Sequence, residues 1–221
     1  MSHWVWPHLH LSPVINRSCA CRIVSLSVDR LRKAIRVFLP TGFPPFAVFS
    51  LNVPVPGQVA RLAAGLHPQL VAFDRLRESY TLVVKRFDES TLQASQPELQ
   101  LATLQQQLPQ VLAGTPAFEA AVREIDFFSE PVRGGGPVVY LTVDSPGLGQ
   151  LHTRLTEAFG VVPELEGDEY VPHITLARGG SVADAELLAD RTIDPISWTV
   201  SQLVIWDSRY REPVARYSLP A

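Results

Sequence analysis

Residues 170–178 read Tyr-Val-Pro-His-Ile-Thr-Leu-Ala-Arg, and this stretch decides how the rest of the chain is interpreted. Apolar and other residues alternate in it, a pattern that favours a β-strand, because successive side chains of a strand point to opposite faces of a sheet. His173 and Thr175 then share one face with Ala177, and the other face packs against a core. The segment therefore predicts a polar pair displayed on one side of a sheet.

An earlier stretch has a similar character. Residues 78–87 read Glu-Ser-Tyr-Thr-Leu-Val-Val-Lys-Arg-Phe, and the run of β-forming residues predicts a strand. By alternation Ser79, Thr81 and Lys85 lie on one face, opposite an apolar row. If the two strands belong to facing lobes, their polar pairs converge on one cleft.

The chain alternates short strands with a few helices, which predicts an α+β protein. Strand, helix and motif strand occur in this order twice, so we expect two lobes related by a pseudo-two-fold duplication. The expected elements are strands at 47–54, 80–87, 118–128, 137–143, 170–178, 198–206 and 215–219, and helices at 56–66, 95–108, 145–160 and 182–190. Pro109 is expected to end or kink the second of these helices.

Composition bounds the protein class. The 221 residues are 46% hydrophobic and 19% charged, as in ordinary globular proteins, and no apolar run reaches the length of about 18–20 residues that a membrane span needs. Cys19 and Cys21 are too close in sequence for a structural disulfide, so we expect reduced thiols and a cytoplasmic location. We also expect a monomer.

The N-terminal segment 1–46 differs from the body at 47–221 and is expected to be an appended or unstructured extension. Residues 1–47 carry a net charge of +5 and the remainder −8, which together give the −3 of the whole chain. Segment 22–39 fits a basic amphipathic helix that would dock on RNA, a membrane surface or a partner. The missing periodicity around it favours a piece without a packed role, and no membrane partner is expected. The acidic body argues against broad nucleic-acid binding but leaves room for recognition of one RNA end.

The motif at 170–178 resembles the second signature of the 2H phosphoesterase superfamily, the family of 2′-5′ RNA ligases and RNA 2′,3′-cyclic phosphodiesterases. The resemblance extends from about Ala47 to the C-terminus and implies two pseudo-symmetric lobes, each carrying a His-x-Thr/Ser motif. It also implies phosphodiester chemistry on an RNA terminus or a small nucleotide, without a cofactor, metal ion or ATP. Residues 1–46 have no counterpart in the family pattern.

The resemblance also implies roles for single residues. His173 would be the acid/base catalyst, and Thr81 and Thr175 would hold the phosphate. Ser79 would stand where the family has its first histidine, as a further phosphate contact, since a serine hydroxyl does not titrate near neutral pH; losing one acid/base group removes about 10²–10⁴ of rate. Lys85 and Arg178 are candidate RNA contacts, with Arg178 expected on the face opposite His173.

Three alternatives remain open from the sequence. The first is a catalytically inactive module that binds an RNA end or a nucleotide. The second is a nucleophile–base pair formed by Ser79 and His173. The third is a regulatory protein whose basic segment at 22–39 docks on a partner. For His173 taken alone, the alternative to a phosphate site is a structural histidine on a half-buried strand.

Overall fold

The computed structural model describes residues 48–132 and 134–221, which belong to one compact unit. The predictions for residues 1–46, including the helix at 22–39 and the thiols of Cys19 and Cys21, lie outside the described residues. In the part that is described, no helix has both the length and the apolar character of a membrane span.

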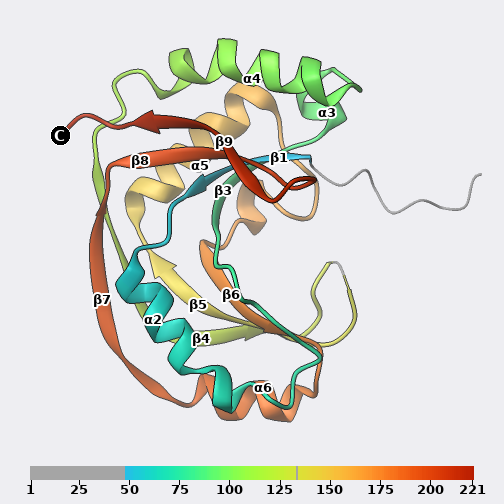
Figure 1. Ribbon diagram of the computed structural model, residues 1–221, viewed down its shortest axis with the longest axis vertical. Coiled ribbons are helices and arrows are strands. Elements are labelled where there is room, and N and C mark those ends of the chain that lie inside the picture. Colours follow the sequence, from blue (N-terminus) through green and yellow to red (C-terminus); the bar gives the residue numbers. More distant parts are fainter. Residues whose placement is uncertain (1–47, 133) are drawn as a thin grey trace, which may run out of the picture. The chain divides into compact units, whose positions relative to one another are not determined.

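The strands form one antiparallel sheet, in which neighbouring strands do not follow the order of the sequence, and helices pack on this sheet (Figure 1). The elements are β1 (Phe49–Val53), α2 (Gly57–Gly65), β2 (Arg75–Leu76), β3 (Leu82–Phe87), α3 (Glu89–Leu92), α4 (Pro97–Leu112), β4 (Phe118–Phe128), β5 (Val138–Asp144), α5 (Pro146–Phe159), β6 (His173–Arg178), α6 (Val182–Ala189), β7 (Thr192–Val200), β8 (Gln202–Asp207) and β9 (Glu212–Ser218).

The sheet has the order β7-β4-β5-β6-β3-β1-β8-β9, with β2 added beside β6. Its two halves meet where β3 lies against β6, the two strands that carry the motif segments. Each half contains the series strand, helix, strand, helix: β1-α2-β3-α4 (with the short α3 before α4) and β5-α5-β6-α6. The predicted duplication is therefore present, with the two lobes joined in one continuous sheet.

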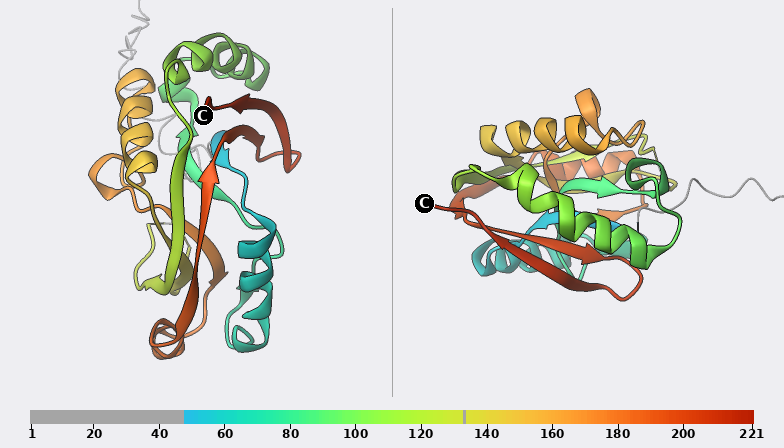
Figure 2. Two further views of the ribbon diagram at one scale, coloured as in Figure 1. Left: turned by 90° about the vertical axis from the view of Figure 1, so that its left-hand side faces the viewer. Right: turned by 90° about the horizontal axis from the view of Figure 1, so that it is seen from above.

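Two helices connect the halves, because each follows a strand of one half and contacts a strand of the other. Helix α5 follows β5 of one half but packs on β3 of the other, beside α4. Helix α2 follows β1, yet its Gln58 amide donates a hydrogen bond to the carbonyl of Ser197 on β7. Figure 2 shows α2 and α5 on opposite sides of the long strands β4 and β7. One apolar core contains residues of both halves, so neither half could bury its apolar side chains without the other.

Sequence patterns placed most elements within a few residues, but β2 and α3 were not predicted, and two further details were wrong. Helix α5 begins after Ser145, whose hydroxyl accepts a hydrogen bond from the backbone N–H of Leu148, as the capping pattern predicts. Helix α4, by contrast, continues through Pro109 to Leu112. Pro109 and Gln105 are exposed, so water can hydrate the carbonyl that loses its donor. The strand predicted at 198–206 is divided between β7 and β8.

Candidate functional site

The pairing of β3 with β6 shows which residue near β3 corresponds to His173 on β6. Strands β3 and β6 are antiparallel, and Leu82 pairs with Ile174. Each strand also has a bulge, at Val84 in β3 and at Leu176 in β6, and the local two-fold axis that superposes the two bulges exchanges Leu82 with Ile174 and Thr81 with His173. The expectation that Ser79 is the counterpart of His173 differs from this register by two residues. Neither Ser79 nor Thr81 offers a group that titrates near neutral pH.

A β-bulge in β3 changes which side chains reach the site. Leu51 and Asn52 are neighbours on β1, but their partners on β3 are Lys85 and Val83, two residues apart. The extra residue reverses the alternation of faces, so Lys85 turns into the core and Arg86 turns onto the face of Val83. Lys85 is 0% exposed, which corrects the prediction that it shares the motif face and contacts RNA.

A similar bulge occurs in β6. Val139 and Tyr140 are neighbours on β5, and their partners on β6 are Ala177 and Thr175. Here the reversal buries Ala177 and turns Arg178 onto the face of His173. The prediction that Arg178 points away from His173 is therefore wrong, because it assumed an unbroken alternation. In both strands the bulge is followed by an arginine that it turns onto the site, Arg86 in β3 and Arg178 in β6.

The buried ammonium of Lys85 holds the bulge of β3 in place. Its Nζ donates to Oε2 of Glu166 at 2.5 Å, and neither side chain is more than 1% exposed. The same carboxylate accepts from the backbone N–H of Arg86 at 2.6 Å and from that of Val162 at 3.0 Å. Burial lowers the pKa of Lys85, and the charge of Glu166 acts against this shift. This carboxylate therefore fixes the backbone that presents Arg86.

Two further contacts tie the same stretch of β3 to the loop before β6. The Nδ1–H of His152 donates to the carbonyl of Val84 at 2.7 Å, while its Nε2 accepts from the N–H of Gly167 at 3.1 Å. The hydroxyl of Tyr170 donates to the carbonyl of Val83 at 2.9 Å. Burial lowers the pKa of His152, which is only 3% exposed, so its role is structural and its ring stays neutral.

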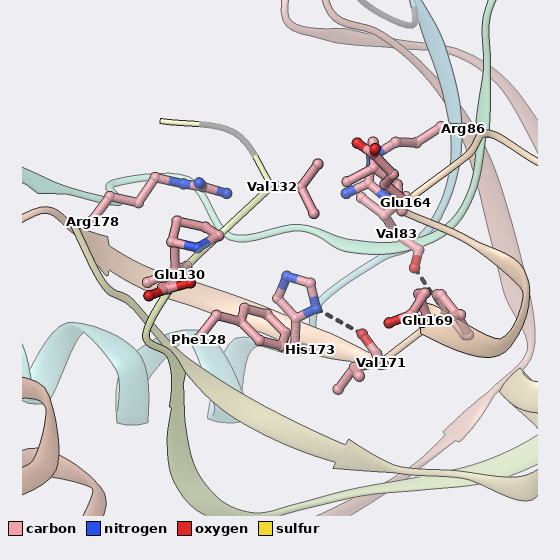
Figure 3. A pocket seen from close by; sticks show the side chains of 14 residues that line it. Val83, Arg86, Phe128, Glu130, Val132, Glu164, Glu169, Val171, His173 and Arg178 are labelled. Atoms are coloured by element: carbon pink, nitrogen blue, oxygen red, sulfur yellow. Dashed lines mark hydrogen bonds between the residues drawn. The ribbon is translucent and has the colours of Figure 1, made fainter. Parts of the chain in front are cut away.

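His173 lies in a cavity of about 360 Å³ between this loop, β3 and the β4–β5 turn (Figure 3). We call it the His173 pocket. Arg86, Arg178 and Phe128 reach its interior, and exposed glutamates stand at its rim. The complete lining is Val83, Arg86, Phe128, Glu130, Pro131, Val132, Val138, Glu164, Leu165, Glu169, Tyr170, Val171, His173 and Arg178.

The ring of His173 is held in one tautomer. Its Nδ1 lies 2.7 Å from the carbonyl oxygen of Val171, which can only accept, so Nδ1 carries the proton and Nε2 is left with a lone pair. The rings of Phe128 and Tyr140 pack against the imidazole at 5.3 and 5.1 Å between centroids. This burial, aided by the charges of Arg86 and Arg178, lowers the pKa of His173 to about 4. The geometry therefore supplies a neutral proton acceptor.

A second cavity, of about 540 Å³, adjoins the first, and Val83 and Arg86 line both. We call it the arginine pocket, since Arg77 and Arg211 also contribute to it. Its lining is Ser50, Asn52, Arg77, Ser79, Thr81, Val83, Arg86, Trp206, Ser208 and Arg211. Of these ten described residues none is acidic, so the pocket favours an anion.

The structure thus brings together part of the predicted site and separates another part. Ser79 and Thr81 line the arginine pocket, whereas His173 and Arg178 line the adjoining His173 pocket. Thr175 is half-buried on β6 and lines neither cavity. The two-fold axis relates it to Val83, which cannot bind a phosphate through a hydroxyl.

Arg86, Arg211 and Phe128 were missed as candidates. The bulge that turns Arg86 onto the site leaves no mark in the run Val-Val-Lys-Arg. Arg211 lies on the turn before β9 and Phe128 at the end of β4, and the approach of both to the site depends on the fold. Within residues 48–132 and 134–221, no group of three or more His, Cys, Asp or Glu side chains is arranged to hold a metal ion.

Comparison with known proteins agrees with this architecture. The family model for the 2′-5′ RNA ligase superfamily matches residues 81–211, more than half of the chain. No curated protein matches the sequence significantly.

Solved structures share the fold at low sequence identity. E. coli LigT complexed with 3′-AMP has 18% identity and a TM-score of 0.54, over 80% of this chain and 100% of LigT. E. coli LigT complexed with NADP+ has 18% identity and a TM-score of 0.53 over the same shares of both chains. A phosphoesterase structure has 19% identity and a TM-score of 0.53, over 80% of this chain and all of its own. At this identity the likeness concerns the fold.

Proposed function

Since the chain belongs to the 2′-5′ RNA ligase superfamily, we propose that it acts on a phosphodiester at an RNA terminus or in a small nucleotide, through His173. The observation that carries the proposal is the open Nε2 of His173 in a pocket that Arg86 and Arg178 also enter. The proposed reaction is opening of a 2′,3′-cyclic phosphate by water. The related 2′-5′ ligation would be the same ring opening with a 5′-hydroxyl in place of water as the nucleophile. The activity is proposed for a monomer in the cytoplasm.

In the hydrolytic direction, a water oxygen attacks phosphorus while Nε2 of His173 accepts the proton of that water. The bond from phosphorus to one ribose oxygen breaks, and this oxygen takes a proton from solvent. Arg86 and Arg178 stabilise the negative charge that grows on the phosphate oxygens in the transition state. The neutral imidazole suits the acceptor role, and an arriving phosphate raises the pKa of His173 through its own negative charge.

The weak point of this reaction is protonation of the leaving oxygen. No second histidine lines either pocket among the described residues, and Thr81 occupies the position that the local two-fold relates to His173. Turnover would therefore be slower by about 10²–10⁴ than with two acid/base groups. This observation favours, as the second candidate, a binding module that recognises an RNA end without turning it over.

The test is incubation of the purified protein, without metal or ATP, with an RNA oligonucleotide ending in a 2′,3′-cyclic phosphate. We expect slow opening to a phosphomonoester, abolished in His173→Ala. Binding that weakens in His173→Ala without any opening would favour the binding module. Absence of both turnover and binding would overturn the proposal.

Two histidine substitutions show where the missing group belongs. Thr81→His should increase turnover by at least about tenfold, since it places an imidazole at the two-fold mate of His173. Ser79→His is the matched control, two residues away, and should leave the rate unchanged. A gain in Ser79→His alone would show that the register argument is wrong.

A further inference from the structure

We propose that the preferred ligand carries two phosphates, one in the His173 pocket and a second in the arginine pocket, with Arg86 between them. The ligand class is a nucleotide with a 5′-phosphate as well as a 3′-terminal phosphate, or the last two phosphates of an RNA strand. This inference deepens the proposed function and rests on it for the identity of the first phosphate. The site for the second phosphate rests on the residues that line the arginine pocket.

The charge of the arginine pocket fits a phosphate group. Arg77 and Arg211 are exposed at its edge, and Arg86 is half-buried where it joins the His173 pocket. Guanidinium groups match phosphate oxygens in geometry and charge and form the stronger, charge-assisted hydrogen bonds. Hydroxyl groups supply further donors; they belong to Ser50, Ser79, Thr81 and Ser208.

The floor of this pocket contains an unmatched polar group. Asn52 is only 3% exposed, and its side-chain oxygen has no hydrogen-bond partner within the described residues. A buried amide oxygen without a partner costs about 1–3 kcal/mol. The Asn52 Oδ1 can only accept a hydrogen bond, so a ligand that satisfies it must donate one. A ribose hydroxyl between two phosphates is such a donor. The pocket thus suits a nucleotide better than an isolated anion.

The hairpin that carries Arg211 is held rigidly. Arg209 donates to both carboxylate oxygens of Asp207, at 2.7 to 3.3 Å, and its guanidinium lies 5.6 Å from the ring of Phe49 on β1. The backbone N–H of Ser208 donates to the carbonyl of Val48. Arg211 itself has a φ of 58°, a left-handed conformation that arginine rarely adopts. Such residues concentrate at functional sites, since the surroundings must hold them in place.

The two pockets differ in what they accommodate. The His173 pocket has an apolar wall that includes Phe128 and Val138, and its volume is in the range of small-ligand sites, so it has room for a nucleoside. The arginine pocket is lined mainly by hydroxyl and guanidinium groups. A nucleotide that spans Arg86 would place its nucleoside against the apolar wall and its second phosphate among the arginines.

The experiment compares three ligands by calorimetry at low salt: cytidine 3′,5′-bisphosphate, cytidine 3′-monophosphate and cytidine 5′-monophosphate. We expect the bisphosphate to bind the unmodified protein at least about tenfold more tightly than the 3′-monophosphate. Arg211→Asn should abolish this gain and leave binding of the 3′-monophosphate unchanged, since asparagine tolerates the left-handed backbone. Arg77→Gln is a second variant that should also reduce the gain.

The matched control is Arg123→Asn. Arg123 is exposed on β4, outside both pockets, and its substitution removes the same net charge. Equal affinity for bisphosphate and 3′-monophosphate would overturn the inference, as would an equal loss in Arg123→Asn and Arg211→Asn. Failure of the proposed function is a separate result: no opening of a cyclic phosphate, with the bisphosphate gain intact, would leave the second phosphate subsite in a binding module.

Discussion

The lowered pKa of His173 makes a quantitative prediction about acid stability. Above pH 6.5 the imidazole is neutral in the folded and the unfolded protein, so it contributes nothing to the pH dependence. As the pH falls from 6.5, the unfolded chain binds a proton while the folded protein, with a pKa of about 4, does not. The free energy of unfolding therefore decreases through this window and levels off below pH 4.

The perturbation is His173→Asn, which removes the titrating group. An asparagine N–H can still donate to the carbonyl of Val171, so the local hydrogen bond at 2.7 Å has a substitute. A shift from 6.5 to about 4 corresponds to about 3 kcal/mol at pH 4. The unmodified protein should lose about 3 kcal/mol more than His173→Asn between pH 7 and pH 4.

The assay is urea unfolding of both proteins at half-unit pH intervals. The difference between them isolates His173, because every other titrating group is shared. A difference that stays constant from pH 7 to pH 4 would refute the argument that Phe128, Tyr140 and the neighbouring arginines desolvate and repel a charged imidazole. An NMR titration of the His173 ring near 6.5 would refute it independently.

Three further predictions concern the scaffold of the site. Lys85→Met should lower the free energy of unfolding, measured in urea, by about 3–5 kcal/mol, since it leaves the buried carboxylate of Glu166 without its ammonium partner. Adding Glu166→Gln should restore part of this loss. A double variant whose loss equals the sum of the two single losses would contradict the pairing. Gly179→Ala should lower the melting temperature, since φ is +83° and a Cβ would lie 2.0 Å from Oδ2 of Asp74; an unchanged temperature would show that the turn relaxes. Ser145→Ala should cost about 1 kcal/mol in urea through loss of the α5 cap, and a cost near zero would mean that the cap contributes nothing.

The order of elements was predictable because it depends on local chemistry. Helix α5 has its leucines on one stripe, Ser145 as a cap and Gly160 at its end, and each of these signals acts within one or two helical turns. Strand β4 was predicted with its observed bounds, 118–128, since a run of β-forming residues ends at turn-forming ones. Helix α4 was predicted too short because solvent exposure of Pro109, a tertiary property, decided the outcome.

The site was only partly predictable, because side-chain direction depends on strand register. Simple alternation placed His173 on the correct face, and it also placed Ser79 and Thr81 near one another in one pocket. The same rule failed for Lys85 and Arg178, each of which follows a bulge. A bulge reverses every later side chain in its strand, and it is set by pairing with a neighbour that is distant in sequence.

By itself, then, the sequence determined the α+β class, the duplicated order of strands and helices, and the histidine at the centre of the second motif. Only the tertiary structure decided which arginines face that histidine, that Thr81 is the residue related to it by the local two-fold, and that two pockets meet at Arg86. The physical reason is range: caps, turns and periodicity act between near neighbours, whereas the bulges, the buried Lys85–Glu166 pair and the approach of the hairpin carrying Arg211 require strands from both halves of the chain to be packed together.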